Sequence, residues 1–374
     1  LWKSPIQEES GGAKKWIQLS NFKSSDQIGG IVAFPQGLFT KQAEGSHSSY
    51  LFYPEFHPEA AVPLTVPECA LSLTQPIGAT DTAQFDCETP TSYSTTVRFD
   101  LKNLHFSRPK NDVPGAVFLT AVSRDGTLVP YSIYPPKDGT QNPARAILTS
   151  YGAYGVESSV TFNRMWSILS EEGFHLVVAH PRGGGYYGRP WREGGRAGNK
   201  LNTVSDLIAV AKAIWKHLKP VQLIGHGKSA GAWPFVASLT ESSSLFDALL
   251  LEMPVLDPLG QLDPADPFLV QEVYEWGEPK NPHIRNMYQK YSPCTGEDLS
   301  AIPPMYIRVG SDDERVPPEG VIRWIKSFTT CHKNASIFLE QSDKTGHLGS
   351  YNLYDEIASE SLRTHFLTHI AETR

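Results

Sequence analysis

The residues best suited to chemistry form a Gly-x-Ser-x-Gly motif, in which Ser229 stands between Gly227 and Gly231. An apolar run at residues 221–224 predicts a buried strand before the motif, and the apolar stretch at 235–239 predicts a helix after it. At such a strand-to-helix turn the serine hydroxyl projects above the sheet, and the glycines let backbone segments pass closely. The pentapeptide also arises by chance, but this context favours Ser229 as a nucleophile.

A serine nucleophile of this kind needs an acid and then a histidine, in that order along the chain. A predicted strand at residues 305–309 is followed at once by an acidic run. A loop with three acids is also typical of a solvated turn, and position alone does not choose among its members, which are Asp312, Asp313 and Glu314.

The histidine that fits the order is His347, which lies among small residues near the C-terminus. We expect it to accept the Ser229 proton as general base and to return it to the leaving group. His226 lies in the approach to the serine turn and is a poor candidate, and His332 and His365 lie in no comparable loop.

Developing negative charge on the substrate needs hydrogen-bond donors. One should be the backbone N–H of Ala230, which follows the nucleophile. A second should come from residues 150–155, which follow a predicted strand at 146–148. The tyrosines of that segment, Tyr151 and Tyr154, are interpreted from the sequence alone as packing residues.

The elements that must position these groups begin near residue 117. Two strands around a turn at residues 124–127 predict a β-hairpin, after which strand-like and helix-like segments alternate. The predicted strands are 116–122, 128–133, 146–148, 175–179, 221–224, 248–251 and 305–309, with a helix at 204–218. This alternation predicts an α/β fold of the α/β-hydrolase type, with a mostly parallel, doubly wound sheet.

The first part of the chain has a different character. Residues 1–113 read as β-rich and irregular, with strands predicted at 30–34, 49–53 and 95–99 between clusters of Gly, Pro, Asn and Asp. We therefore divide the chain into a β-rich segment, 1–113, and a catalytic domain, 114–374.

The composition of the chain argues against several classes of binding partner. The chain of 374 residues carries 33 Lys and Arg against 40 Asp and Glu, a formal net charge of -7 without a basic stripe, which argues against nucleic acid. The sequence shows neither a transmembrane run nor a signal peptide. Four cysteines without a CxxC pair predict neither a zinc site nor a disulfide framework, which favours a reducing compartment. We expect a cytoplasmic monomer without cofactor, metal or membrane.

Taken together, the motifs resemble the prolyl oligopeptidase family of serine peptidases. The motifs are Tyr151-Gly152-Ala153-Tyr154-Gly155, Arg182-Gly183-Gly184-Gly185, Gly227-Lys228-Ser229-Ala230-Gly231, Glu275-Trp276-Gly277-Glu278-Pro279, Tyr291-Ser292-Pro293, Asp313-Glu314-Arg315-Val316 and Gly346-His347. The resemblance runs from about residue 117 to the C-terminus. Its Glu-Trp-Gly and Tyr-Ser-Pro elements look most like the oligopeptidase B branch, which cuts after Arg or Lys.

The resemblance implies roles that the residues alone left open. It selects Asp313 as the acid, because the family's acid stands two residues before an arginine. That arginine, Arg315, resembles one that contacts the substrate backbone. Tyr151 matches an oxyanion-hole hydroxyl, which reverses its interpretation as a packing residue. Glu272 matches one of two acids that receive a basic substrate side chain, whereas Tyr274 stands in place of the other.

The sequence also departs from the family. Lys228 precedes the nucleophile, Ala232 replaces a glycine, and Pro234 lies early in the predicted helix. Residues 1–113 resemble the final strands of the family's β-propeller but are too few to close one, so we expect a propeller remnant, either because the chain is a fragment or because the gate is missing. An esterase or thioesterase on the same fold, or a non-catalytic binding protein, remains an alternative.

Overall fold

A mixed sheet of eight strands forms the centre of the protein. The computed structural model describes residues 2–3, 17–18, 28–44, 47–57, 60–66, 69–73, 81–107, 115–137, 139, 144–158, 160–260, 269–292, 294 and 302–370. The strands are β11 (Val117–Val122), β12 (Leu128–Tyr134), β13 (Arg145–Ser150), β14 (Phe174–Ala179), β15 (Gln222–Lys228), β16 (Ala248–Glu252), β17 (Met305–Gly310) and β18 (Ile337–Ser342). Their order in the sheet is β11-β12-β14-β13-β15-β16-β17-β18.

The direction of the strands agrees with the alternation in the sequence. β11 pairs with β12 in the predicted antiparallel hairpin, and β12 is antiparallel to β14, whereas every pair from β14 to β18 is parallel. Every residue of β14, β16 and β17 is buried, as expected for parallel strands covered on both faces. The carboxyl ends of these strands meet at one edge of the sheet, where ligands bind in folds of this type.

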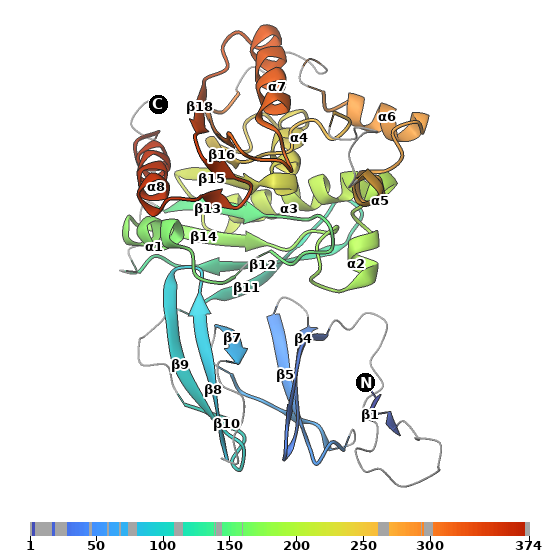
Figure 1. Ribbon diagram of the computed structural model, residues 1–374, viewed down its shortest axis with the longest axis vertical. Helices are drawn as coiled ribbons and strands as arrows, with labels where there is room; N and C mark the ends of the chain where they lie inside the picture. Colours follow the sequence, from blue (N-terminus) through green and yellow to red (C-terminus); the bar gives the residue numbers. More distant parts are fainter. Residues whose placement is uncertain are drawn as a thin grey trace.

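Helices cover both faces of the sheet (Figure 1). They are α1 (Arg164–Glu171), α2 (Arg189–Glu193), α3 (Lys200–His217), α4 (Trp233–Leu239), α5 (Leu269–Trp276), α6 (Pro282–Gln289), α7 (Pro318–Cys331) and α8 (Leu353–His369). The apolar side chains of α3, α4, α6 and α7 share one core with the sheet, and those of α1 and α8 share another. The helix predicted at 204–218 is α3, which begins four residues earlier.

Two further sheets, each of four antiparallel strands, precede the eight-stranded sheet (Figure 1). One consists of β3 (Ile28–Phe34), β4 (Gly37–Glu44), β5 (His47–Pro54) and β6 (Val62–Pro63), and the other of β7 (Ala70–Leu73), β8 (Thr82–Thr89), β9 (Ser92–Asp100) and β10 (His105–Phe106). Their facing sides share an aromatic core that includes Phe34, Phe39, Phe52, Phe85 and Phe99. The turn between β8 and β9 meets the start of α1, where Tyr93 stacks on Phe162. Two short strands, β1 (Trp2–Lys3) and β2 (Ile17–Gln18), pair with each other.

The cysteines differ from the expectation. All four are paired, Cys69 with Cys87 and Cys294 with Cys331. Disulfides persist mainly in oxidising compartments, so the argument from the cysteines for a reducing compartment is lost. Spacings of 18 and 37 residues follow no motif that would have revealed these pairs. Across the described ranges, none of the helices has the length and apolar character needed to span a membrane.

Candidate active site

Ser229 lies at a strained turn between β15 and a short 3-10 helix, η3 (Ser229–Ala232). Its φ of 54° lies in the left-handed region, which non-glycine residues adopt at a cost of order 1–3 kcal/mol. The flanking glycines make the turn possible, because a Cβ at Gly227 would lie 2.5 Å from Ala232 Cα and one at Gly231 would lie 2.7 Å from Ser150 O. Pro234 lies in the first turn of α4, where proline is tolerated.

The structure brings Ser229, His347 and Asp313 into one hydrogen-bonded chain. His347 Nε2 lies 2.9 Å from Ser229 Oγ, and His347 Nδ1 lies 2.8 Å from Asp313 Oδ2. The Asp313 side chain is buried, and its Oδ1 accepts hydrogen bonds from the backbone N–H groups of Arg315 and Val316 at 3.0 and 2.9 Å. These bonds fix the carboxylate against the imidazole, as a residue that orients a general base requires.

The two loops that carry Asp313 and His347 are joined to each other. Asp313 follows β17, and His347 lies between the short strands β19 (Thr345–Gly346) and β20 (Gly349–Ser350). The backbone N–H of Asp312 donates to Thr345 O at 3.0 Å. The neighbouring acid, Asp312, is exposed and accepts a hydrogen bond from Ser311, so it takes no part in the chain.

Tyr151 lies on the other side of the serine, in the loop that follows β13. Burial raises the pKa of its hydroxyl, and the nearby Ser229 side chain acts on that pKa in the opposite direction. A neutral phenol in this position is a hydrogen-bond donor at neutral pH. Ala230 is buried directly after the nucleophile, so its backbone N–H belongs to the same corner of the site.

A buried ion pair, which the sequence analysis missed, supports this loop. Lys200 Nζ lies 2.5 Å from Glu275 Oε1, and both side chains are 0% exposed. The same Nζ donates to Gly152 O at 3.1 Å, and Glu275 Oε2 accepts from the backbone N–H of Tyr154 at 2.9 Å. The pair therefore fixes the backbone of Gly152 and Tyr154, just after Tyr151 in the chain. Lys200 and Glu275 are 75 residues apart, and no local spacing links them.

Glu272 and Arg315, the two residues predicted to bind substrate, have different surroundings. The Glu272 carboxylate accepts hydrogen bonds from Tyr154 Oη at 2.7 Å and from Trp276 Nε1 at 3.0 Å, so it is already engaged within the protein. Arg315 is exposed, and its charge acts on the Tyr151 hydroxyl, which places it near the nucleophile.

His226 has a structural role, because both of its ring nitrogens are hydrogen-bonded to other side chains. Its Nδ1 lies 2.8 Å from Thr149 Oγ1 and its Nε2 lies 3.0 Å from Glu252 Oε1. Burial opposes ionisation of Glu252, but Arg363 and His226 outweigh it and hold the pKa of that carboxyl well below its usual range. With both ring nitrogens engaged, His226 does not serve Ser229. No cluster of three or more His, Cys, Asp or Glu side chains suited to a metal ion occurs among the described residues.

The chain is similar in sequence to known proteins. Residues 160–373 match the prolyl oligopeptidase family. A prolyl endopeptidase-like protein of Rattus norvegicus is 31% identical over 211 residues, which are 55% of this chain and 29% of that protein. Protease 2 of Moraxella lacunata is 30% identical over 250 residues, which are 65% of this chain and 36% of that protein. The matched residues thus span 29% and 36% of the length of these two relatives.

Solved structures share the fold over nearly the whole chain. A prolyl endopeptidase from a study of inter-domain dynamics superposes with a TM-score of 0.82 at 19% identity, covering 97% of this chain and 53% of that one. Oligopeptidase B from Leishmania major gives a TM-score of 0.77 at 20% identity, covering 94% of this chain and 53% of that one.

Proposed function

Because the chain belongs to the prolyl oligopeptidase family, we propose that it is a serine peptidase that hydrolyses short peptides. Ser229 is the nucleophile, His347 the general base and Asp313 the acid. The observation that carries the proposal is the continuous hydrogen-bonded chain from Asp313 through His347 to Ser229.

The geometry supports a two-step acyl transfer. Ser229 Oγ attacks the carbonyl carbon of the scissile bond while His347 Nε2 accepts its proton. Asp313 holds the imidazole in one tautomer and stabilises the imidazolium. His347 then protonates the leaving amine, the C–N bond breaks, and an acyl-enzyme remains. Water repeats the attack with His347 again as base, which releases the carboxylic acid and restores Ser229.

The negative charge on the tetrahedral intermediate falls on the carbonyl oxygen. The Tyr151 hydroxyl and the Ala230 backbone N–H are the donors proposed for it. The raised pKa of Tyr151 keeps its proton in place for this role. Arg315, exposed beside this corner, is proposed to contact the substrate backbone.

A preference for Arg or Lys before the scissile bond rests on Glu272. Because Tyr154 and Trp276 already donate to this carboxylate, and because Tyr274 replaces the second acid, the preference should be weak. The ratio of kcat/KM for matched arginine and citrulline amides measures it.

The two antiparallel sheets at the start of the chain are proposed to be blades of a β-propeller. Each is a four-stranded antiparallel sheet whose strands pair mostly in chain order, which is the form of a propeller blade. Two such sheets are fewer than the about four to eight blades that make up a closed propeller.

Labelling with a fluorophosphonate tests the proposed function. We expect the wild-type protein and a Ser361→Ala control, changed at an exposed serine of α8, to react equally, and Ser229→Ala to remain unlabelled. An unlabelled wild-type protein would refute the serine mechanism and favour a binding protein. Turnover of a short-chain thioester without turnover of any peptide amide would favour the thioesterase alternative.

A further inference from the structure

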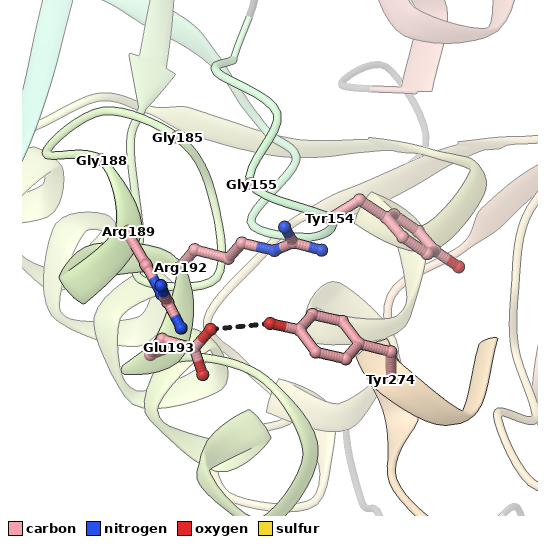
Figure 2. Close-up of a pocket in the computed structure, with 8 residues that line it drawn as sticks. All are labelled: Tyr154, Gly155, Gly185, Gly188, Arg189, Arg192, Glu193 and Tyr274. Carbon is pink, nitrogen blue, oxygen red and sulfur yellow. Dashed lines mark hydrogen bonds between the residues drawn. The ribbon is translucent and has the colours of Figure 1, made fainter. Parts of the chain in front are cut away.

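A cavity of about 440 Å³ opens beside the loop that carries Tyr151 (Figure 2). Tyr154 and Gly155 of that loop form one wall, Arg189 and Arg192 of α2 form another, and Tyr274 of α5 lies across from them. The Tyr154 ring is 6.5 Å from the Tyr151 ring, and the Tyr151 hydroxyl lies near Ser229. The cavity is therefore separated from the nucleophile by two aromatic side chains.

Arg192 is fixed in this cavity by packing. A Cβ at Gly155 would lie only 2.7 Å from Arg192 Cδ, so the arginine stem rests directly on that glycine. The guanidinium carbon lies 4.8 Å from the centroid of the Tyr274 ring. Arg192 Nε is shielded from solvent and has no hydrogen-bond partner among the described residues.

The surrounding charges leave the cavity positive. Glu193 is the carboxylate that lines it, and its Oε1 accepts a hydrogen bond from the Tyr274 hydroxyl at 2.9 Å (Figure 2). Its Oε2 lies 2.7 Å from an Arg196 nitrogen, so both oxygens are occupied. Arg196 also lies over the Tyr274 ring, at 3.7 Å from its centroid. The guanidinium groups of three arginines thus surround the one carboxylate of Glu193; they belong to Arg189, Arg192 and Arg196. Glu272, on the far side of Tyr154, is hydrogen-bonded to Tyr154 and Trp276.

We propose that this cavity is a subsite for a carboxylate of the peptide substrate, with Arg192 and Arg189 as the groups that bind it. The planar fork of a guanidinium matches a carboxylate in two parallel hydrogen bonds, and a preorganised arginine loses little freedom on binding. The carboxylate belongs either to an acidic side chain or to the C-terminus of a short peptide. The subsite rests on the proposed peptidase function, and it would distinguish this chain from an enzyme that selects basic residues alone.

Binding to the Ser229→Ala protein tests the subsite without turnover. Fluorescent peptides that differ only in Glu, Gln or Lys near the scissile bond are each prepared with a C-terminal acid and with an amide. We expect the Glu peptide, or the acid form, to bind about tenfold tighter than its neutral counterpart at low salt. A Glu-to-Gln difference identifies a side chain as the source, and an acid-to-amide difference identifies the terminus.

Variants assign the effect to the cavity. Arg192→Gln in the Ser229→Ala background should reduce the tenfold ratio to about one, whereas Arg285→Gln, a matched change of an exposed arginine on α6, should leave it intact. Tyr274→Glu should have the same effect as Arg192→Gln, because the new carboxylate would occupy the guanidinium groups. Thermal melting identifies a variant that fails to fold, and Arg189→Gln then replaces it.

Several results would overturn the subsite. Equal binding of all forms, tightest binding of the Lys peptide, or a ratio that survives Arg192→Gln would each contradict it. Failure of the peptidase proposal is distinct, since the wild-type protein would then cleave no peptide even if Ser229→Ala still discriminated among them.

Discussion

Glu275→Gln removes the charge from one partner of an ion pair that is wholly buried beneath the Tyr151 loop. Both Lys200 and Glu275 are 0% exposed, so water cannot solvate the ammonium that the substitution leaves behind. Burial already lowers the pKa of Lys200, and the Glu275 carboxylate opposes that shift, so removing the carboxylate favours a neutral lysine. Breaking such a pair costs about 3–5 kcal/mol, and because Gln can still accept from Tyr154 N–H we expect about 3 kcal/mol.

Urea unfolding measures this cost, and a surface pair provides the control. Lys137 Nζ lies 2.7 Å from Glu171 Oε1, with side chains 67% and 53% exposed. Glu171→Gln makes the same chemical change in a solvated pair and should cost less than about 1 kcal/mol. A loss below about 1 kcal/mol for Glu275→Gln as well would refute the reasoning that burial makes this pair indispensable.

The same substitution should change the kinetics through the loop. Lys200 holds Gly152 O and Glu275 holds Tyr154 N–H, so a weaker pair lets Tyr151 move relative to the developing oxyanion. We expect kcat to fall more than KM rises, because the Tyr151 hydroxyl is needed mainly in the transition state. An unchanged kcat in a destabilised Glu275→Gln protein would show that the pair supports the fold and not the positioning of Tyr151.

Two further predictions concern the Tyr151 hydroxyl and the stability of the protein at low pH. Tyr151→Phe should lower kcat on a peptide amide about 100-fold at unchanged thermal stability, since one oxyanion donor is lost; steady-state kinetics and melting curves measure both, and an unchanged kcat would exclude the hydroxyl as a donor. Burial opposes ionisation of Glu356, but Arg308 and Arg363 lower its pKa to about 2. Since this folded value lies below the ordinary one near 4.5, the stabilisation is complete above about pH 5 and is lost as the pH falls towards 2. Glu356→Gln should therefore lose about 2 kcal/mol at pH 7 and almost nothing at pH 2 in chemical unfolding, and a pH-independent difference would contradict the ion pair.

The residues proposed as nucleophile, base and acid could be picked out from the sequence because each lies near a strand end with its own local pattern. A Gly-x-Ser-x-Gly turn needs small neighbours for steric reasons, and Gly227 and Gly231 meet that need. The residues alone did not choose between Asp312 and Asp313, and the choice of Asp313 came from the family resemblance, through the arginine two residues later. Burial and two backbone donors distinguish Asp313 in the structure.

Contacts between segments that lie far apart in the chain could not be predicted from the sequence. Lys200 and Glu275 meet because α3 and α5 pack against the same loop, and neither residue has a partner at helical spacing. The hydrogen bond that Glu272 accepts from Tyr154 is likewise not local in sequence. Tyr154 lies 118 residues earlier in the chain.

Lys228 raises the question of how a cation beside the nucleophile is tolerated. Side chains two residues apart on a strand point to the same face, so Lys228 shares the face of His226. Both line a cavity of about 470 Å³ together with Glu252, Glu356 and other charged groups. The Lys228 charge is one of those that lower the pKa of Glu252. Carboxylates that line the same cavity therefore offset the cation.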